Sequence, residues 1–153
     1  MTPPAKSAKR GIAYDLADPL DFQALAPGVS WWYNWGSQPN KAVPADYVAQ
    51  YGLDYYPMLW NGNYDATAVE SYLQANPNIK YLLVMNEPNL TSQSNLTPTQ
   101  AAAIWPGYEA ISAKTGVKIG DHRRVLHLAD RTHHLQMRTH RQNIGIGHGV
   151  GCR

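Results

Sequence analysis

Short apolar runs alternate with longer amphipathic segments along the first part of the chain, up to about residue 120. The runs have the length of β-strands, and the segments between them have the apolar spacing of helices. The clearest run, residues 81–85, is apolar throughout, as expected of a strand that is buried on both faces of a parallel sheet. Further strands are predicted at residues 11–14, 29–33 and 55–60, and from residue 117 onward.

Capping residues and apolar spacing predict four helices between these strands. They are expected at residues 21–25, at 44–52 with Pro44 in the first turn, at 65–75 with Asp65 as cap, and at 97–114 with a capping box at its start. Pro106 and Gly107 are expected to kink or split the last helix. Repeated strand–helix units predict a parallel sheet with right-handed crossovers, so the fold class is α/β, with about four βα units and a fifth strand.

The buried run at residues 81–85 ends abruptly in Asn86-Glu87-Pro88. Pro88 disfavours helix at the preceding residue and cannot donate to a strand ladder, so the strand should stop here. A lone carboxylate that leaves the C-terminal end of a buried parallel strand occupies the position where α/β barrels carry catalytic groups. Glu87 is therefore a candidate general acid/base, with Asn86 as an uncharged contact for a substrate hydroxyl. A polar turn without a chemical role is the alternative interpretation.

Aromatic residues gather at the predicted C-terminal ends of the second and third strands, on the same rim as the candidate acid/base. Indole and phenol rings stack on the apolar faces of sugars, and their N–H and O–H groups reach hydroxyls. Side chains alternate between the two faces of a strand, so some of these rings should pack in the core and others should line a cleft. We expect Trp35 and Trp60 to be sugar platforms, with further candidate contacts at Trp32, Asn34 and Asn61.

Composition changes sharply near residue 120. Residues 1–120 hold seven Lys or Arg against nine Asp or Glu, a net charge of −2, and they contain every Trp, Tyr, Phe and Pro. Residues 121–153 hold six Arg against two Asp, a net charge of +4, together with all six His and a Gly-rich end. A coding sequence read in the wrong frame would yield such a change. We therefore interpret residues 121–153 as a tail that is unrelated to the preceding fold.

This tail could have a function of its own, and three classes are weakly supported. Its His residues lack a recognised ligand spacing, so no metal site is predicted. Six Arg without an aromatic platform could contact nucleic acid nonspecifically, so no specific nucleic-acid partner is predicted. The Gly-rich run lacks both the strand–turn–helix context and the Lys of a phosphate loop.

Residues 1–8 are polar, contain Pro3-Pro4 and predict a disordered leader. This segment has basic residues but lacks the apolar core of a signal peptide, and no run in the chain approaches membrane-spanning length. Cys152 is the only cysteine, so an internal disulfide is excluded. Neither a cofactor nor a membrane partner is predicted.

Four stretches in a fixed order resemble glycoside hydrolase family 128: KRGIAY at residues 9–14, SWWYNWG at 30–36, YPMLWN at 56–61, and the strand that ends in Asn86-Glu87-Pro88. The similarity runs from about residue 9 to residue 120. It implies the N-terminal half of a (β/α)8 TIM barrel from the large clan of retaining glycosidases, with Glu87 as acid/base at the end of the fourth strand. It also implies action on β-1,3-glucan, of the endo-β-1,3-glucanase kind, and a secreted or cell-wall location.

The resemblance further implies a nucleophile, a Glu at the end of a seventh strand, which this sequence does not reach. A retaining enzyme needs that carboxyl about 5–5.5 Å from the acid/base. Asp15 is the one alternative within the chain, although a loop or capping role suits it better. We therefore expect a truncated and inactive chain that self-associates through open sheet edges. The competing functions are a noncatalytic glucan- or cell-wall-binding module and an unrelated α/β domain.

Overall fold

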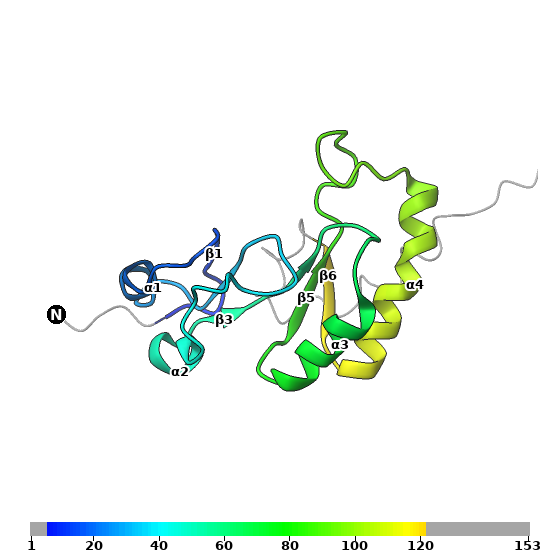
Figure 1. Ribbon diagram of the computed structural model, residues 1–153. Helices are drawn as coiled ribbons and strands as arrows, with labels where there is room; N and C mark the ends of the chain where they lie inside the picture. Colours follow the sequence, from blue (N-terminus) through cyan, green and yellow to red (C-terminus); the bar gives the residue numbers. More distant parts are fainter. Residues whose placement is uncertain (1–5, 122–153) are drawn as a thin grey trace, which may run out of the picture.

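The computed structural model describes residues 6–121 of the chain. Six short strands and four helices follow one another in this part of the molecule (Figure 1). Their order is β1 (Gly11–Ala13), α1 (Pro19–Leu25), β2 (Trp31–Tyr33), α2 (Tyr47–Tyr51), β3 (Asp54–Tyr55), β4 (Met58–Leu59), α3 (Ala66–Ala75), β5 (Tyr81–Val84), α4 (Pro98–Thr115) and β6 (Lys118–Asp121).

The described strands form two parallel sheets, with the orders β1-β2-β3 and β4-β5-β6. In the first sheet Ile12 lies opposite Trp32, and in the second sheet Leu83 lies opposite both Met58 and Gly120. Helices α1 and α2 lie beside the first sheet, and α3 and α4 lie beside the second (Figure 1). The predicted α/β class with parallel pairing is confirmed, and the strands of residues 6–121 form two small sheets without closing into a barrel.

The predicted third strand, residues 55–60, is divided at Tyr56-Pro57 into β3 and β4. On one side the Tyr56 amide donates to the Trp32 carbonyl at 2.9 Å, and on the other side the Leu83 amide donates to the Pro57 carbonyl at 2.8 Å. Pro57 has no N–H to donate, so a ladder cannot run through it unbroken. The prediction of one continuous strand is therefore wrong: the ladder with β2 ends at Tyr55 and the ladder with β5 begins at Met58. The Met58 amide still donates to the Gly36 carbonyl after β2 at 2.7 Å, so the segment keeps contact with both sides.

Apolar side chains fill the space between each sheet and its helices. The cluster beside α1 and α2 contains Leu16, Phe22, Trp32, Tyr47, Leu53 and Tyr55. The cluster beside α3 and α4 contains Leu59, Val69, Leu73, Ile79, Leu82, Val84, Met85, Tyr108, Ile111 and Val117. Burial of one large apolar side chain stabilises a fold by about 1.5–3 kcal/mol, so these two clusters hold the helices on the sheets.

A third buried cluster joins the two sheets on the face that strand alternation turns away from the helices. Its core consists of Trp31, Met58 and Leu83. The Trp31 ring stacks on Tyr56 with a centroid distance of 5.3 Å and an interplanar angle of 12°. The same ring lies across Gly11, where a Cβ atom would come within 2.1 Å of it. Only glycine fits there, because a neighbouring ring occupies the space of a side chain.

Hydrogen bonds fix three residues that the sequence assigns to a disordered leader. The Lys6 ammonium donates to carbonyls at the end of α2. The Ser30 hydroxyl donates to the Ser7 carbonyl at 3.0 Å, and Trp31 Nε1 donates to the Ala8 carbonyl at 3.2 Å. Residues 6–8 therefore contact α2 and β2, and the disordered leader stays a prediction. Residues 1–5 of the predicted leader and 122–153 of the predicted tail lie outside the described residues.

Several predicted helix ends agree with the structure. Asp65 caps α3, with its carboxylate accepting from the Ala68 amide at 3.0 Å. Thr97 and Gln100 form the capping box of α4. Gly52 ends α2 in a left-handed conformation with φ of 60°, which glycine adopts without steric penalty. These contacts are local, so the sequence alone could reveal them.

Two predicted helix starts are corrected. Helix α1 begins at Pro19, two residues before the predicted start, because Asp18 caps it, and α2 begins at Tyr47 because the preceding residues form turns. Helix α4 continues through Pro106 as one helix, so the split does not occur, while the alternative of a kink stays a prediction. Close packing supports the continuous helix: a Cβ at Gly107 would lie 2.7 Å from the Tyr64 hydroxyl, so glycine leaves room for this ring.

Replacing Gly11 with Ala is expected to destabilise the fold. The added methyl group overlaps the Trp31 ring, and overpacking of this kind costs about 1–3 kcal/mol. Gly28→Ala is the matched control, because a Cβ at Gly28 meets only the Leu25 carbonyl oxygen at 3.8 Å, an ordinary contact. Urea unfolding followed by circular dichroism measures both variants. An unfolding free energy for Gly11→Ala equal to that of the wild type would contradict the predicted overlap.

The chain is also expected to self-associate through its sheet edges. In the described sheets, β1, β3, β4 and β6 are the outer strands, and each pairs with one neighbour. Unpaired strand edges are templates for pairing with another chain. Sedimentation velocity should therefore reveal dimers or larger species whose fraction grows with protein concentration. A monodisperse monomer that unfolds in one sharp transition would show that the edges are protected.

Candidate active site

Glu87 follows the end of β5, three residues after Val84. The backbone between them is unusual, because Met85 and Glu87 have φ values of 55° and 42°. Left-handed backbone at a residue with a side chain costs about 1–3 kcal/mol and is concentrated at functional sites. In this turn the Glu87 side chain is half-buried, whereas residues 82–86 are buried. The candidate acid/base therefore emerges from the core at the end of its strand.

A returning loop fastens the Glu87 turn to the end of β4. The Ser94 hydroxyl lies within hydrogen-bond distance of the Trp60 and Asn86 carbonyls. The Asn86 amide donates to the Trp60 carbonyl at 2.9 Å, and Asn86 Nδ2 donates to Gln93 Oε1 at 2.8 Å. Asn86 is 3% exposed, and these bonds make it a residue that holds the loop. Its predicted contact with a substrate hydroxyl stays a prediction.

The Tyr33 phenol lies in the electrostatic range of Glu87. Burial raises the pKa of Tyr33 above its ordinary value, and the negative charge of Glu87 raises that pKa further. The phenol therefore keeps its proton at neutral pH and remains a hydrogen-bond donor near the carboxylate. The Tyr33 ring also packs edge-on against Trp35, with a centroid distance of 5.4 Å. These contacts bring the ends of β2 and β5 to one rim.

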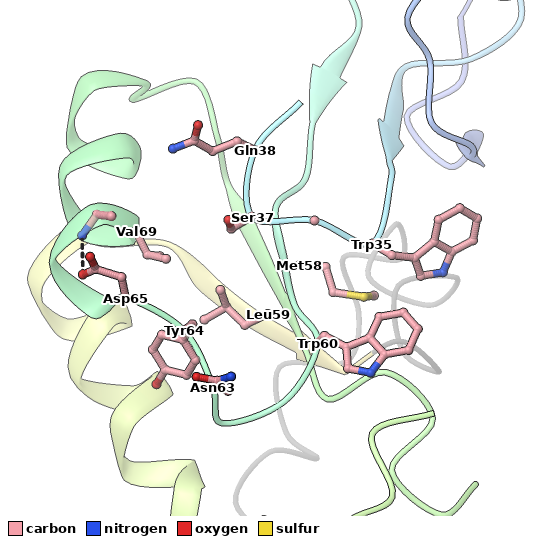
Figure 2. A pocket seen from close by; sticks show the side chains of 12 residues that line it. Trp35, Ser37, Gln38, Met58, Leu59, Trp60, Asn63, Tyr64, Asp65 and Val69 are labelled. Atoms are coloured by element: carbon pink, nitrogen blue, oxygen red, sulfur yellow. Dashed lines mark hydrogen bonds between the residues drawn. The ribbon is translucent and has the colours of Figure 1, made fainter. Parts of the chain in front are cut away.

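Trp35 and Trp60 expose their rings on this rim. Trp35 is 38% exposed and Trp60 is 36% exposed. Figure 2 shows that both indole rings extend to the same side of the strand as the Met58 side chain. Met58 belongs to the cluster that joins the two sheets, so this side is the face turned away from the helices. Two exposed indoles beside a carboxylate form a surface that suits sugar rings.

Hydrogen bonds on both sides of Trp35 hold it in a left-handed conformation with φ of 61°. The Gly36 amide donates to Asn34 Oδ1 at 3.1 Å, and Asn34 Nδ2 donates to the Gln38 carbonyl at 3.2 Å. From the core, the Tyr55 hydroxyl reaches Asn34 Oδ1 and the Gly36 carbonyl. Burial raises the pKa of Tyr55 far above its ordinary value, so this hydroxyl stays protonated. Asn34 thus shapes the loop that carries Trp35.

Asp15 belongs to the same loop network. Asn34 Nδ2 donates to Asp15 Oδ1 at 3.1 Å, and Asn40 Nδ2 donates to Asp15 Oδ2 at 3.2 Å. Both carboxylate oxygens therefore accept hydrogen bonds from loop amides. This is the loop role that the sequence favours for Asp15 over a nucleophilic one.

Trp32 does not belong to the rim. Its side chain is fully buried, and its ring packs edge-on against Phe22 with a centroid distance of 5.3 Å. A ring with no exposed surface cannot stack on a sugar, so the predicted substrate contact is corrected and Trp32 is a core residue. Asn61 lies in the loop after β4, where its Oδ1 accepts from the Asn63 amide at 2.9 Å. Its substrate contact stays a prediction.

Two residues that shape this rim, Tyr55 and Ser94, were not predicted from the sequence. Each is a single polar or aromatic residue without a motif around it. Tyr33 belongs to the aromatic group that the sequence places on this rim, and it lies one residue from buried Trp32 and therefore on the opposite face. The roles of Tyr55 and Ser94 depend on contacts with residues distant in sequence, which no local pattern reveals.

Within residues 6–121, no group of three or more His, Cys, Asp or Glu is arranged to hold a metal ion. The helices described here are also too short or too polar to cross a membrane. The rim therefore offers one half-buried carboxylate, a protonated phenol and two exposed indoles. This combination suits proton transfer to a neutral, ring-shaped ligand.

Comparison with known proteins identifies the family of this chain. Residues 11–124 match the family described as the glycosyl hydrolase catalytic core. A search of curated proteins found no match. Solved structures of glycoside hydrolase family 128 match the chain. A subgroup II endo-β-1,3-glucanase from Pseudomonas viridiflava is 54% identical with a TM-score of 0.73, and the match covers 74% of this chain and 44% of that one.

Two further structures extend the comparison. A subgroup II endo-β-1,3-glucanase from Sorangium cellulosum is 38% identical with a TM-score of 0.64, over 73% of this chain and 44% of that one. A subgroup III curdlan-specific exo-β-1,3-glucanase from Blastomyces gilchristii, in complex with glucose, is 32% identical with a TM-score of 0.55, over 73% of this chain and 45% of that one. The matched part of this chain thus corresponds to less than half the length of each relative.

The family match contains nearly all of the stretches that carry the resemblance in sequence, from Gly11 through the Glu87 turn, and it ends four residues beyond the predicted boundary at residue 120. The structural relatives with the highest identities share the same family. The resemblance is thereby confirmed: this chain belongs to the glycosyl hydrolase catalytic core family, in glycoside hydrolase family 128.

Proposed function

We propose that this chain forms the acid/base half of the active site of a retaining endo-β-1,3-glucanase, with Glu87 as the acid/base. The observation that carries the proposal is the rim itself. The Glu87 carboxylate follows a buried parallel strand, acts electrostatically on Tyr33, and shares its edge with exposed Trp35 and Trp60. Two relatives from subgroup II are endo-β-1,3-glucanases, which supports the substrate class and the mode of cleavage.

Glu87 would act twice in the reaction. In the first step its carboxylic acid gives a proton to the glycosidic oxygen while a second carboxylate attacks C1 of the sugar. The leaving sugar departs with that proton, and the attacking carboxylate forms a covalent ester with C1. In the second step the Glu87 carboxylate takes a proton from water, whose oxygen attacks C1 and breaks the ester. Hydrolysis releases the sugar and returns Glu87 to its acid form.

The second carboxylate is proposed to lie outside the described residues. Asp15, the alternative within them, is engaged by Asn34 and Asn40 in its loop. The match also corresponds to only 44% of the length of the two subgroup II relatives. We therefore propose that this chain binds glucan without turning it over.

Trp35 and Trp60 are proposed to be the sugar platforms. Both rings are more than one-third exposed and lie on one side of the strand (Figure 2). Asn34, Asn61 and Asn86 stay as candidates for contacts with sugar hydroxyls, although the bonds described above already occupy part of their hydrogen-bonding capacity.

Replacing either platform with alanine should weaken glucan binding. Loss of one stacked ring is worth about 1.4 kcal/mol, so Trp35→Ala and Trp60→Ala should each raise the Kd for a linear β-1,3-gluco-oligosaccharide about tenfold. Isothermal titration calorimetry measures the effect. Trp105→Phe is the control, because Trp105 packs against Tyr108 in α4 and should leave the Kd unchanged. If all three variants bind the oligosaccharide with the wild-type Kd, the rim is not the glucan site.

The chain should release no reducing sugar from laminarin above background. General acid–base catalysis contributes about 10²–10⁴-fold, but this contribution requires a nucleophile at the correct distance. Turnover that disappears in Glu87→Gln and in Asp15→Asn would contradict the prediction and identify Asp15 as the nucleophile. Binding without turnover is also the behaviour of a noncatalytic glucan-binding module. The two explanations are separated by joining the Glu87-containing half to the remaining part of a family enzyme. An enzyme half predicts that this longer chain hydrolyses laminarin and that its Glu87→Gln variant does not, whereas a binding module predicts no turnover in either.

A further inference from the structure

A cavity of about 240 Å³ opens beside the two platform tryptophans (Figure 2). Three chain segments surround it: residues 35–38 after β2, residues 58–60 at β4, and residues 63–69 leading into α3. Glu87 does not line this cavity, so the cavity is distinct from the position of the acid/base. The catalytic proposal leaves it without a role.

The cavity lining suits a neutral polyhydroxylated group. Ser37 contributes a hydroxyl, Gln38 and Asn63 contribute amides, and Asp65 contributes a carboxylate. The lining has no Lys, Arg or His, so an anionic ligand would find a carboxylate and no basic partner. Amides, hydroxyls and carboxylates beside apolar surface are the groups that bind sugar hydroxyls and ring faces.

The position of the cavity relates it to the glucan platforms. Trp35 and Trp60 line its edge, and Figure 2 shows their rings on one side of the strand while Ser37, Gln38 and Asp65 lie toward α3. Buried Leu59 and Val69 bound the cavity on the side of the core. A sugar group that projects from a chain bound on the two tryptophans toward α3 would therefore enter the space between β4 and α3.

The size of the cavity limits its occupant. Sites for drug-sized ligands have about 300–1,000 Å³, so this cavity suits one sugar ring and is too small for a row of them. In a β-1,3-linked glucan the 6-hydroxyl is exocyclic and free, so it is the hydroxyl that reaches farthest from the main chain. A single glucosyl group attached there would match the polarity, the size and the sideways direction.

Building on the proposed glucan site, we propose that this cavity is a specificity subsite for a single glucosyl branch on the 6-hydroxyl of a β-1,3-glucan. The main chain lies on Trp35 and Trp60, and the branch enters the cavity beside Ser37, Gln38 and Asp65. The chain thus prefers branched over linear glucan.

The experiment compares two ligands, a linear β-1,3-gluco-oligosaccharide and the same oligosaccharide with one β-1,6-linked glucosyl branch. Calorimetric titration of the whole chain should give a Kd about tenfold lower for the branched ligand, the effect of one or two added hydrogen bonds. Ala68→Leu narrows the cavity from its lining and should abolish that preference while leaving linear binding unchanged. The substitution keeps the backbone amide of residue 68, so Asp65 can still cap α3 by accepting from it.

Ala75→Leu is the matched control, because it makes the same change on the same helix outside the cavity lining and should retain the preference. Gln38→Ala is a second test variant, to be used if circular dichroism shows that Ala68→Leu does not fold. It removes one side-chain amide from the cavity lining, keeps the backbone carbonyl that accepts from Asn34, and should reduce the preference for the branched ligand.

Equal wild-type Kd values for the two ligands would overturn the proposed branch subsite but not the proposed glucan site. Equal weakening of linear and branched binding by Ala68→Leu would overturn it as well, since the cavity would then hold the main chain. Absence of binding by either ligand would overturn both proposals.

Discussion

The described fold depends on one short segment, residues 54–60, which has hydrogen-bonding neighbours on both sides. Its amides at Asp54, Tyr56 and Met58 donate to carbonyls of residues 30–36, and its carbonyls at Pro57 and Leu59 accept from amides of residues 83–85. The segment therefore lies between β2 and β5 and connects the two sheets. The loops after β2, β4 and β5 therefore meet at a common edge, where Trp35, Trp60 and Glu87 form the rim that we propose as the glucan site.

Because side chains alternate between the two faces of a strand, consecutive aromatic residues lie on opposite faces of the sheet. Trp32 and Tyr55 face the helices and stabilise the first sheet from one side. Trp31 and Tyr56 stack on the other face, in the cluster that joins the two sheets. The helix face carries packing, while the opposite face carries the proposed glucan site at its C-terminal edge. A parallel sheet covered by helices permits this division, since both of its faces are occupied.

Much of this architecture could be predicted from local signals. Asp65 marks the start of α3 through a contact between neighbours in sequence, and Glu87 stood out because a proline stops a buried strand directly after it. Trp32 could not be assigned in this way. Two adjacent Trp residues indicate a strand, but the pairing register with neighbouring strands decides which of the two rings faces the helices. Ser94 and Trp60 are 34 residues apart, so their contact exists only once the chain has folded.

The left-handed backbone at Trp35, Met85 and Glu87 has a consequence for evolution. Glycine at Trp35 or Glu87 would relax the backbone by about 1 kcal/mol or more, while it removed an indole or a carboxylate from the rim. At Met85, which belongs to the core cluster beside α3 and α4, glycine would instead leave a cavity whose cost exceeds the strain it relieves. Mutational drift under selection for thermal tolerance alone would therefore favour glycine at the residues that give the rim its chemistry. A laboratory lineage evolved only for heat resistance would lose the proposed glucan-binding rim before it lost its fold.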